Sequence, residues 1–180
     1  MEVQQAIMER RSNRRFLDEA VMHEDFLEIV RLSSYAPSWR NSQSIRYMLV
    51  EDRALQDEIA ANCVLGAEYN AKIINSAPAL VLVLQILGCS GFEPDGSFTT
   101  GQEDRWQMFD AGVACQTFCL AAHDLDYGTV IMGVFDHVKV GAAADIPASQ
   151  QVAAMIAIGH PTHISKMPPR LAVEDLVIFR

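Results

Sequence analysis

The sequence contains no hydrophobic run long enough to cross a membrane. A bilayer-spanning helix needs about 20 consecutive apolar residues, and a run such as 79–84 is far shorter. The N-terminus also lacks an apolar segment and carries an acidic Glu2, which is unlike a secretory signal. These absences predict a cytoplasmic protein with no part embedded in a membrane.

Positive charge is scarce in this chain. It has 14 lysines and arginines against 23 aspartates and glutamates, so its formal net charge is −9. Binding to nucleic acids depends mainly on the neutralisation of phosphates by cationic side chains. The overall charge therefore argues against a nucleic-acid partner and against an anionic membrane surface.

Short spacings between potential metal ligands are also missing. Cysteines stand at 63, 89, 115 and 119 without a C-x-x-C pair, and the five histidines form neither a metal-binding nor a triad pattern. We therefore expect no metal site and no disulfide framework. The four cysteines are expected to be reduced and mostly buried thiols.

Half of the residues are hydrophobic, and no repeat or low-complexity linker interrupts the chain, so residues 1–180 are expected to form one domain. The continuous apolar run 79–86 favours a strand covered on both faces. An apolar strand at 176–179, at the chain end, needs another sheet to pair with. Periodicity and turn residues predict helices at 2–11, 24–36, 54–63, 68–75, 104–124 and 136–143, and further strands at 45–51, 129–135 and 151–159.

The densest group of positive charges lies in residues 10–15, Arg-Arg-Ser-Asn-Arg-Arg. The first 46 residues contain seven arginines and seven acidic residues, so the rest of the chain carries the whole net negative charge. Guanidiniums beside a hydroxyl in an acidic protein suggest a bound small anion such as a phosphate monoester. The alternative is that these arginines neutralise a helix dipole and lie in solvent.

Three further segments carry polar or glycine-rich patterns. Residues 36–43, Ala-Pro-Ser-Trp-Arg-Asn-Ser-Gln, offer carboxamides that suit the polar edge of a flat heterocycle, or they form an ordinary turn. The segment 128–133 is bounded by glycines that let a ligand approach the backbone, or it is a plain core strand. Residues 159–170 bring cations back near the end of the chain, or they form a solvated linker.

These four segments, in this order, resemble the motifs of the nitroreductase family of flavin enzymes. The family's D-x-G-x-A-x-Q motif is matched by residues 110–116, Asp-Ala-Gly-Val-Ala-Cys-Gln. The resemblance extends from about Met8 to Phe179, and its specificity comes from the order and spacing of the motifs together. It implies an α+β fold with a central mixed β-sheet flanked by helices. It also implies a homodimer that exchanges its C-terminal strand and holds FMN at the subunit interface.

The resemblance further implies which residues hold FMN. Asp110 is expected to be a buried hydrogen-bonding residue rather than a catalytic acid. The phosphate would be bound by Arg10, Arg11, Ser12 and Arg14, helped by Lys166 and Arg170. The flavin would be approached by Pro37, Ser38, Asn41 and Gln43, in part from the partner subunit, and its N5 region would face the backbone of Ile131, Met132 and Gly133.

The implied activity is hydride transfer from NADH or NADPH, through the flavin, to an electron-poor small molecule such as a nitroaromatic or a quinone, with ping-pong kinetics. No protein residue is assigned a catalytic role, because flavin N5 carries the hydride. The chain has no G-x-G-x-x-G segment from which to read a preference between the two nicotinamides. Two alternatives stay open: a relative with different flavin chemistry, such as reductive dehalogenation or a flavin-consuming reaction, and a non-catalytic flavin-binding dimer.

The sequence departs from the family pattern in three places, which affect the choice of acceptor most. Ser44-Ile45 stand where the family often has Pro-Trp, and residues 125–128 read Leu-Asp-Tyr-Gly where the family has L-G-L-G. The helical segment that larger members place over the flavin is shortened here to about residues 87–104. The long loop 88–102 is rich in turn residues. Its Phe92 and Phe98, with nearby Trp106, are expected to line the acceptor side of the flavin. The alternative is that this loop is a surface excursion far from the flavin.

Overall fold

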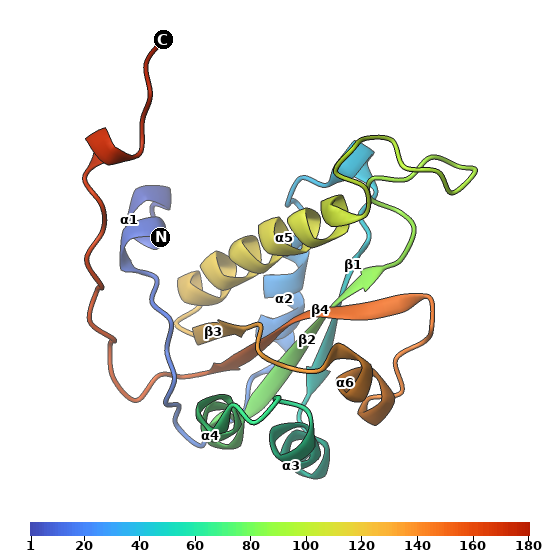
Figure 1. Cartoon of the computed structure of the whole chain (residues 1–180). Helices are drawn as coiled ribbons and strands as arrows, with labels where there is room; N and C mark the ends of the chain where they lie inside the picture. Colours follow the sequence, from blue (N-terminus) through green and yellow to red (C-terminus); the bar gives the residue numbers. More distant parts are fainter.

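The computed structural model describes all 180 residues and shows helices packed on both faces of one sheet (Figure 1). The α+β class expected from the sequence is confirmed. The helices are α1 (Val3–Glu9), α2 (His23–Ser33), α3 (Arg53–Asn62), α4 (Glu68–Ser76), α5 (Arg105–Asp124) and α6 (His137–Ala143). The strands are β1 (Ile45–Val50), β2 (Ala79–Ile86), β3 (Gly128–Met132) and β4 (Gln150–Gly159), and 3₁₀ turns lie at Trp39–Asn41 and Val173–Asp175.

The sheet has the strand order β1-β2-β4-β3, and every neighbouring pair is antiparallel. The expected mixed sheet is therefore not found within one chain. The only parallel contact is an isolated bridge between Ser12 and Thr129 at the outer edge of β3. The segment before α2 touches the sheet at single bridges rather than along a ladder, so it adds no parallel strand.

Strand β2 lies at the centre of the fold and is buried on both faces, as its continuous apolar run predicts. Alternate residues of a strand point to opposite faces. Leu80, Leu82 and Leu84 accordingly join the core beneath α3, α4 and α6, whereas Val81 and Val83 join the core beneath α2 and α5. The two cores hold the sheet between two helical layers and fix the position of α5 (Figure 1).

Helix α5 is buried along one side only. Ala114, Cys115 and Phe118 pack into the core, with Phe118 fully buried against Tyr47 at a ring-centroid distance of 5.3 Å. On the other side Phe109 is 60% exposed, and Met108, in the first turn, is 53% exposed. The expectation that this helix is buried nearly all round is therefore wrong for the single chain. No helix, α5 included, combines the length and apolarity that crossing a bilayer requires.

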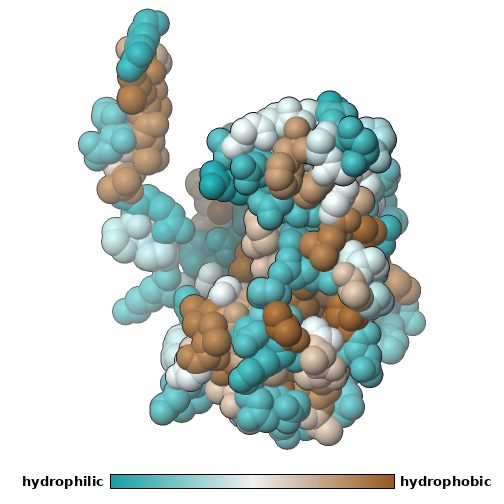
Figure 2. All heavy atoms as spheres, turned by 45° about the vertical axis from the view of Figure 1, so that its right-hand side comes forward, coloured by the Kyte–Doolittle hydropathy of each residue, from teal (hydrophilic) through white to brown (hydrophobic).

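The C-terminal tail, residues 171–180, forms no strand in the single chain. It contains only the 3₁₀ turn at Val173–Asp175 and runs away from the body of the protein (Figure 1). Its apolar side chains are exposed, Ile178 by 82% and Phe179 by 93%, and Figure 2 shows hydrophobic surface on the projecting segment. A strand needs a neighbour for its backbone hydrogen bonds, and no strand of the same chain lies beside these residues.

Candidate functional site

The cationic residues from the two ends of the chain meet in one cavity. A cavity of about 240 Å³, here called the cation pocket, is lined by cationic side chains, two serines and one proline. All six residues that the sequence assigned to a phosphate therefore lie together. The pocket is lined by Arg10, Arg11, Ser12, Arg14, Ser165, Lys166, Pro168 and Arg170.

Backbone contacts to the end of the sheet bring these segments together. The Asn13 N–H donates to the Thr129 carbonyl at 2.9 Å, and the Ser165 hydroxyl donates to Asn13 Oδ1 at 3.2 Å. Gly128 is needed at this point, because a Cβ there would lie 2.9 Å from the Asn13 Cβ. Nearby, the Leu17 N–H donates to the His160 carbonyl at 2.8 Å. Strands β3 and β4 thus hold residues 10–17 beside the segment that follows β4.

The positive charge of the cation pocket is not neutralised by carboxylates. None of its four arginines, nor Lys166, forms an ion pair with an acidic side chain. Arg14 and Arg170 donate only to backbone carbonyls of their own segments, at 3.2 and 3.3 Å. The Nε of Arg10 is buried and has no hydrogen-bond partner. A phosphate would supply the missing acceptors and the missing negative charge, so the residues present fit this group.

The residues assigned to the flavin N5 region follow directly along β3. Thr129, whose carbonyl accepts from the cationic segment, is buried. Ile131 is 45% exposed, and no atom lies within 4 Å of the place that a Cβ would take at Gly133. A strand advances about 3.3 Å per residue, so residues 131–133 lie within roughly 15 Å of Thr129, which forms a bridge with Ser12 of the cation pocket.

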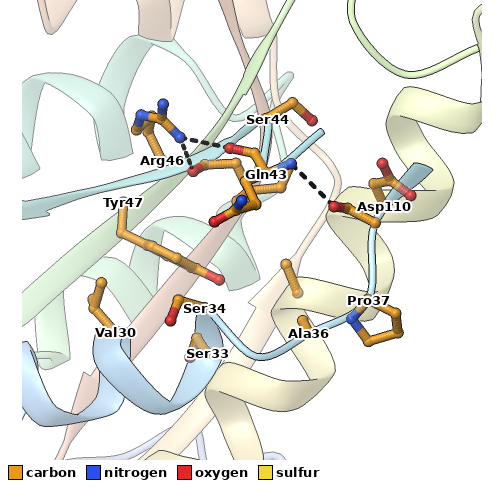
Figure 3. Close-up of a pocket in the computed structure, with 13 residues that line it drawn as sticks. Val30, Ser33, Ser34, Ala36, Pro37, Gln43, Ser44, Arg46, Tyr47 and Asp110 are labelled. Atoms are coloured by element: carbon orange, nitrogen blue, oxygen red, sulfur yellow. Dashed lines mark hydrogen bonds between the residues drawn. The ribbon is translucent and has the colours of Figure 1, made fainter. Parts of the chain in front are cut away.

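The polar loop, residues 36–44, encloses a second cavity of about 330 Å³ together with α2, β1 and α5 (Figure 3). Pro37, Ser38 and Gln43 line it, whereas Asn41 does not. Three residues of this loop that are not glycine have a left-handed backbone: Arg40, Asn41 and Gln43, with φ of 45°, 56° and 48°. Such a conformation is costly and persists only where the surroundings hold it in place.

Asp110 is one of the groups that hold the polar loop. Its carboxylate is buried and accepts the backbone N–H of Trp39 at 2.9 Å and the hydroxyl of Ser90 at 2.6 Å. This confirms the expectation of a buried hydrogen-bonding residue. A further bond inside the loop runs from the Gln43 N–H to Ser38 Oγ at 3.0 Å.

The aromatic loop, residues 88–102, packs against the polar loop rather than standing apart from it. The guanidinium of Arg40 makes two hydrogen bonds of 3.1 Å to the carboxylate of Glu93. The rings of Trp39 and Trp106 lie 4.8 Å apart. Phe92 and Phe98 contact each other, with ring centroids 5.0 Å apart. Of the three aromatic residues assigned to the acceptor, only Trp106 touches the polar loop through its ring.

The cation pocket and the polar loop lie at opposite ends of α5. The Met1 ammonium donates to the carboxylate of Asp124, the last residue of α5, at 2.6 Å, and the Asn13 N–H donates to the Thr129 carbonyl shortly after the helix, so the cationic segment lies at the C-terminal end of α5. Asp110, near the first turns, holds the polar loop. The helix separates these two points along its axis. The separation is visible in Figure 1, where the N-terminal segment and the 3₁₀ turn at 39–41 lie at the two ends of α5.

Comparison with known proteins then identifies the family. A family model described as "Nitroreductase family" matches residues 7–72 and 64–160. The chain belongs to the nitroreductase family.

Individual relatives are distant but extend over most of the chain. A protein of Archaeoglobus fulgidus whose name includes NADH dehydrogenase/NAD(P)H nitroreductase is 26% identical over 159 residues, or 86% of this chain and 83% of that protein. An FMN reductase (NAD(P)H) of Bacillus subtilis is 27% identical over 184 residues, covering 96% and 71%. A protein of Desulfovibrio desulfuricans, described as a nitroreductase and solved in complex with FMN, is 28% identical with a TM-score of 0.75, covering 100% and 97%.

Two residues that support the polar loop and the cation pocket from a distance carry no signal in the sequence. Ser90 is fully buried and bonds Asp110, yet it lies in a stretch where turn residues are the only signal. Ser165 closes the cation pocket through Asn13. Each contact joins residues at least 20 positions apart in the chain. No local spacing could have indicated them.

The Arg40–Glu93 pair should keep the polar loop in place at neutral pH. The hydrogen bonds from Arg40 lower the pKa of Glu93, so the pair is complete above the ordinary glutamate pKa of about 4.3 and is lost as the pH falls through the lowered value. Trp39 and Trp106 are the only tryptophans, so their fluorescence reports on this region alone. We expect constant emission between about pH 7 and 5 and a red shift in Glu93→Gln at pH 7.

The control is Glu28→Gln, which breaks an exposed pair with Arg31 on α2 and should leave the emission unchanged. A Glu93→Gln spectrum identical to the parent would show that the pair does not hold the loop.

Proposed function

We infer that this protein is an FMN-dependent NAD(P)H oxidoreductase of the nitroreductase type. The observation that carries this function is the cation pocket, in which five cations lack any carboxylate partner. A terminal phosphate monoester with its double negative charge matches such a pocket. Support comes from the relatives, one named FMN reductase (NAD(P)H) and one solved with FMN.

Each part of the site then has a role in holding the cofactor. Arg10, Arg14 and Arg170 bind the phosphate as charged donors. The backbone at 131–133, two to four residues beyond the cationic segment's contact at Thr129, faces the flavin ring. The carboxamides of Asn41 and Gln43 donate to and accept from its polar edge. FMN, when bound, supplies the hydride chemistry, so the protein needs no catalytic acid or base of its own.

The complete site takes residues from two copies of this chain. The cation pocket and the polar loop lie at opposite ends of α5, so the polar loop of one copy serves the cation pocket of its partner. The exposed side of α5, with Met108 and Phe109, provides an apolar surface for this association. The tail, with four apolar residues at 176–179, exchanges onto the partner and gains there the strand neighbour that it lacks within its own chain.

The second substrate is an electron-poor small molecule such as a nitroaromatic or a quinone. NADH or NADPH binds first and leaves, and the acceptor then takes the same place beside the flavin. Phe92, Phe98 and Trp106 offer aromatic faces on which a flat, electron-poor ring stacks. The ion pair between Arg40 and Glu93 fixes the aromatic loop to the polar loop, which is how these rings come close to the flavin.

The purified protein should be yellow and should release FMN rather than FAD on denaturation. Arg10→Ala and Arg14→Ala should each weaken FMN binding by about 1.5–3 kcal/mol, the scale of a hydrogen bond to a charged group. Titration of the apoprotein by flavin fluorescence measures this loss. Arg31→Ala is the matched control, because Arg31 lies on α2 and pairs with Glu28. A colourless protein that reconstitutes with neither flavin would refute the proposed function.

The protein should also be a dimer that does not dissociate without unfolding. We expect an interface of more than about 2,000 Å² in total, as in other obligate homodimers. Deleting 176–180 should reduce both the thermal stability and the flavin content, whereas deleting only the terminal Arg180 should change neither. Sedimentation and flavin absorbance at micromolar concentration test this. A folded, flavin-loaded monomer would contradict it.

Replacement of both Phe92 and Phe98 by alanine should raise the KM for a quinone acceptor. FMN content and the rate of flavin reduction by NAD(P)H should stay nearly unchanged, because these rings pair with each other and are not assigned to FMN. Steady-state and stopped-flow kinetics separate the two half-reactions. Acceptor kinetics equal to those of the parent would favour the alternative that the loop is a surface excursion.

A further inference from the structure

The carboxylate of Asp110 is unusual because it is buried without a cation. It is 3% exposed and forms no ion pair. A buried charge is unfavourable unless hydrogen bonds compensate it. All of its bonds come from two loops that are distant in sequence: the Trp39 N–H reaches its two oxygens at 2.9 and 3.2 Å, and the Ser90 hydroxyl donates at 2.6 Å.

Ser90 extends this contact into a group of hydroxyls. It is fully buried, and its Oγ lies 3.1 Å from Ser42 Oγ and 3.2 Å from Ser44 Oγ. Ser42 and Ser44 belong to the polar loop, whereas Ser90 belongs to the aromatic loop. The three serine hydroxyls therefore link the two loops directly. Asp110 in turn links both loops to the first turns of α5.

The segment held in this way is the strained one. Trp39, whose N–H is bonded to Asp110, immediately precedes the left-handed residues Arg40 and Asn41, and Gln43 is left-handed as well. Non-glycine residues adopt this backbone only where other contacts impose it. Loss of the Asp110 bonds would allow the segment to relax toward ordinary backbone angles and would move the carboxamides of Asn41 and Gln43.

We propose that Asp110 is a positioning residue that, through Trp39 and Ser90, holds the polar loop in its strained shape and couples it to the aromatic loop. In this role Asp110 acts only through the hydrogen bonds that it accepts from Trp39 and Ser90. On the proposed function, on which this inference rests, the shape of the polar loop determines the affinity for FMN. Substitution of Ser90, in the aromatic loop, should therefore weaken FMN binding. Substitution of Phe92 and Phe98 in the same loop should leave FMN binding unchanged.

The test compares Asp110→Asn and Ser90→Ala with the parent and with Gln56→Ala. Asp110→Asn keeps the size of the side chain but replaces one acceptor oxygen by a donor. Gln56 is the matched control, because it is also buried and bonds backbone, at Val50 and Pro78, but lies away from both loops. Its substitution lowers stability without touching the polar loop.

Two readouts need no flavin. Trypsin cleavage after Arg40, followed by mass spectrometry with cleavage after Lys166 as the internal reference, reports on the order of the polar loop. Emission of the two tryptophans reports on the packing of Trp39. In Asp110→Asn and Ser90→Ala we expect cleavage after Arg40 to be at least about tenfold faster and the emission to shift to the red, whereas Gln56→Ala resembles the parent in both readouts.

The third readout is the dissociation constant for FMN, which should rise about tenfold in both variants and stay within about twofold in Gln56→Ala. Parental cleavage and parental FMN affinity in Asp110→Asn and Ser90→Ala would overturn the positioning role. If Asp110→Asn does not fold, Ser90→Ala decides the question alone, since it removes only a hydroxyl. Failure of the parent itself to bind FMN would instead overturn the proposed function, and the cleavage measurement would still decide whether Asp110 holds the loop.

Discussion

Packing of α5 across the sheet sets the distance between the two halves of the proposed site. The helix is fixed by Phe118, which is fully buried between Phe26 and Tyr47 and so ties α5 to α2 and β1. Its C-terminal end lies beside the cationic segment, and its first turns hold the polar loop through Asp110. The helix therefore holds these two regions apart along its axis. The same packing leaves one side of α5 exposed, and that side is the surface that we propose for a second copy.

Electrostatics complements this geometry. An acidic protein of net charge −9 keeps five cations together without a carboxylate among them. Mutual repulsion in the cation pocket lowers the stability of the free protein, and a bound phosphate group would remove that repulsion. Binding to the folded state alone would therefore raise the stability of the chain by linkage. The carboxylate of Asp110 is the opposite case, because hydrogen bonds alone compensate its charge.

Much of the fold could be predicted from the sequence, because patterns of burial are local. The alternating faces of β2 and the apolar stripe of α2 follow directly from residue order. All six residues assigned to the phosphate line the cation pocket. The exceptions depend on distant neighbours. The tail at 176–179 has strand-like residues but no strand beside it in its own chain, and the expected parallel pairing is reduced to a single bridge at Ser12. Ser90 carries no sequence signal, since its role arises only where two loops meet Asp110.

The central claim, that one FMN site is built from two chains, is tested most directly by mixed dimers. One chain would carry Arg10→Ala and Arg14→Ala, the other Asn41→Ala and Gln43→Ala, and different affinity tags would allow the mixed dimer to be isolated after co-expression. We expect each variant homodimer to lack FMN and the mixed dimer to bind about one FMN, because one of its two sites receives only parental residues. A mixed dimer as free of FMN as both homodimers would contradict the account and would place the whole site within a single chain.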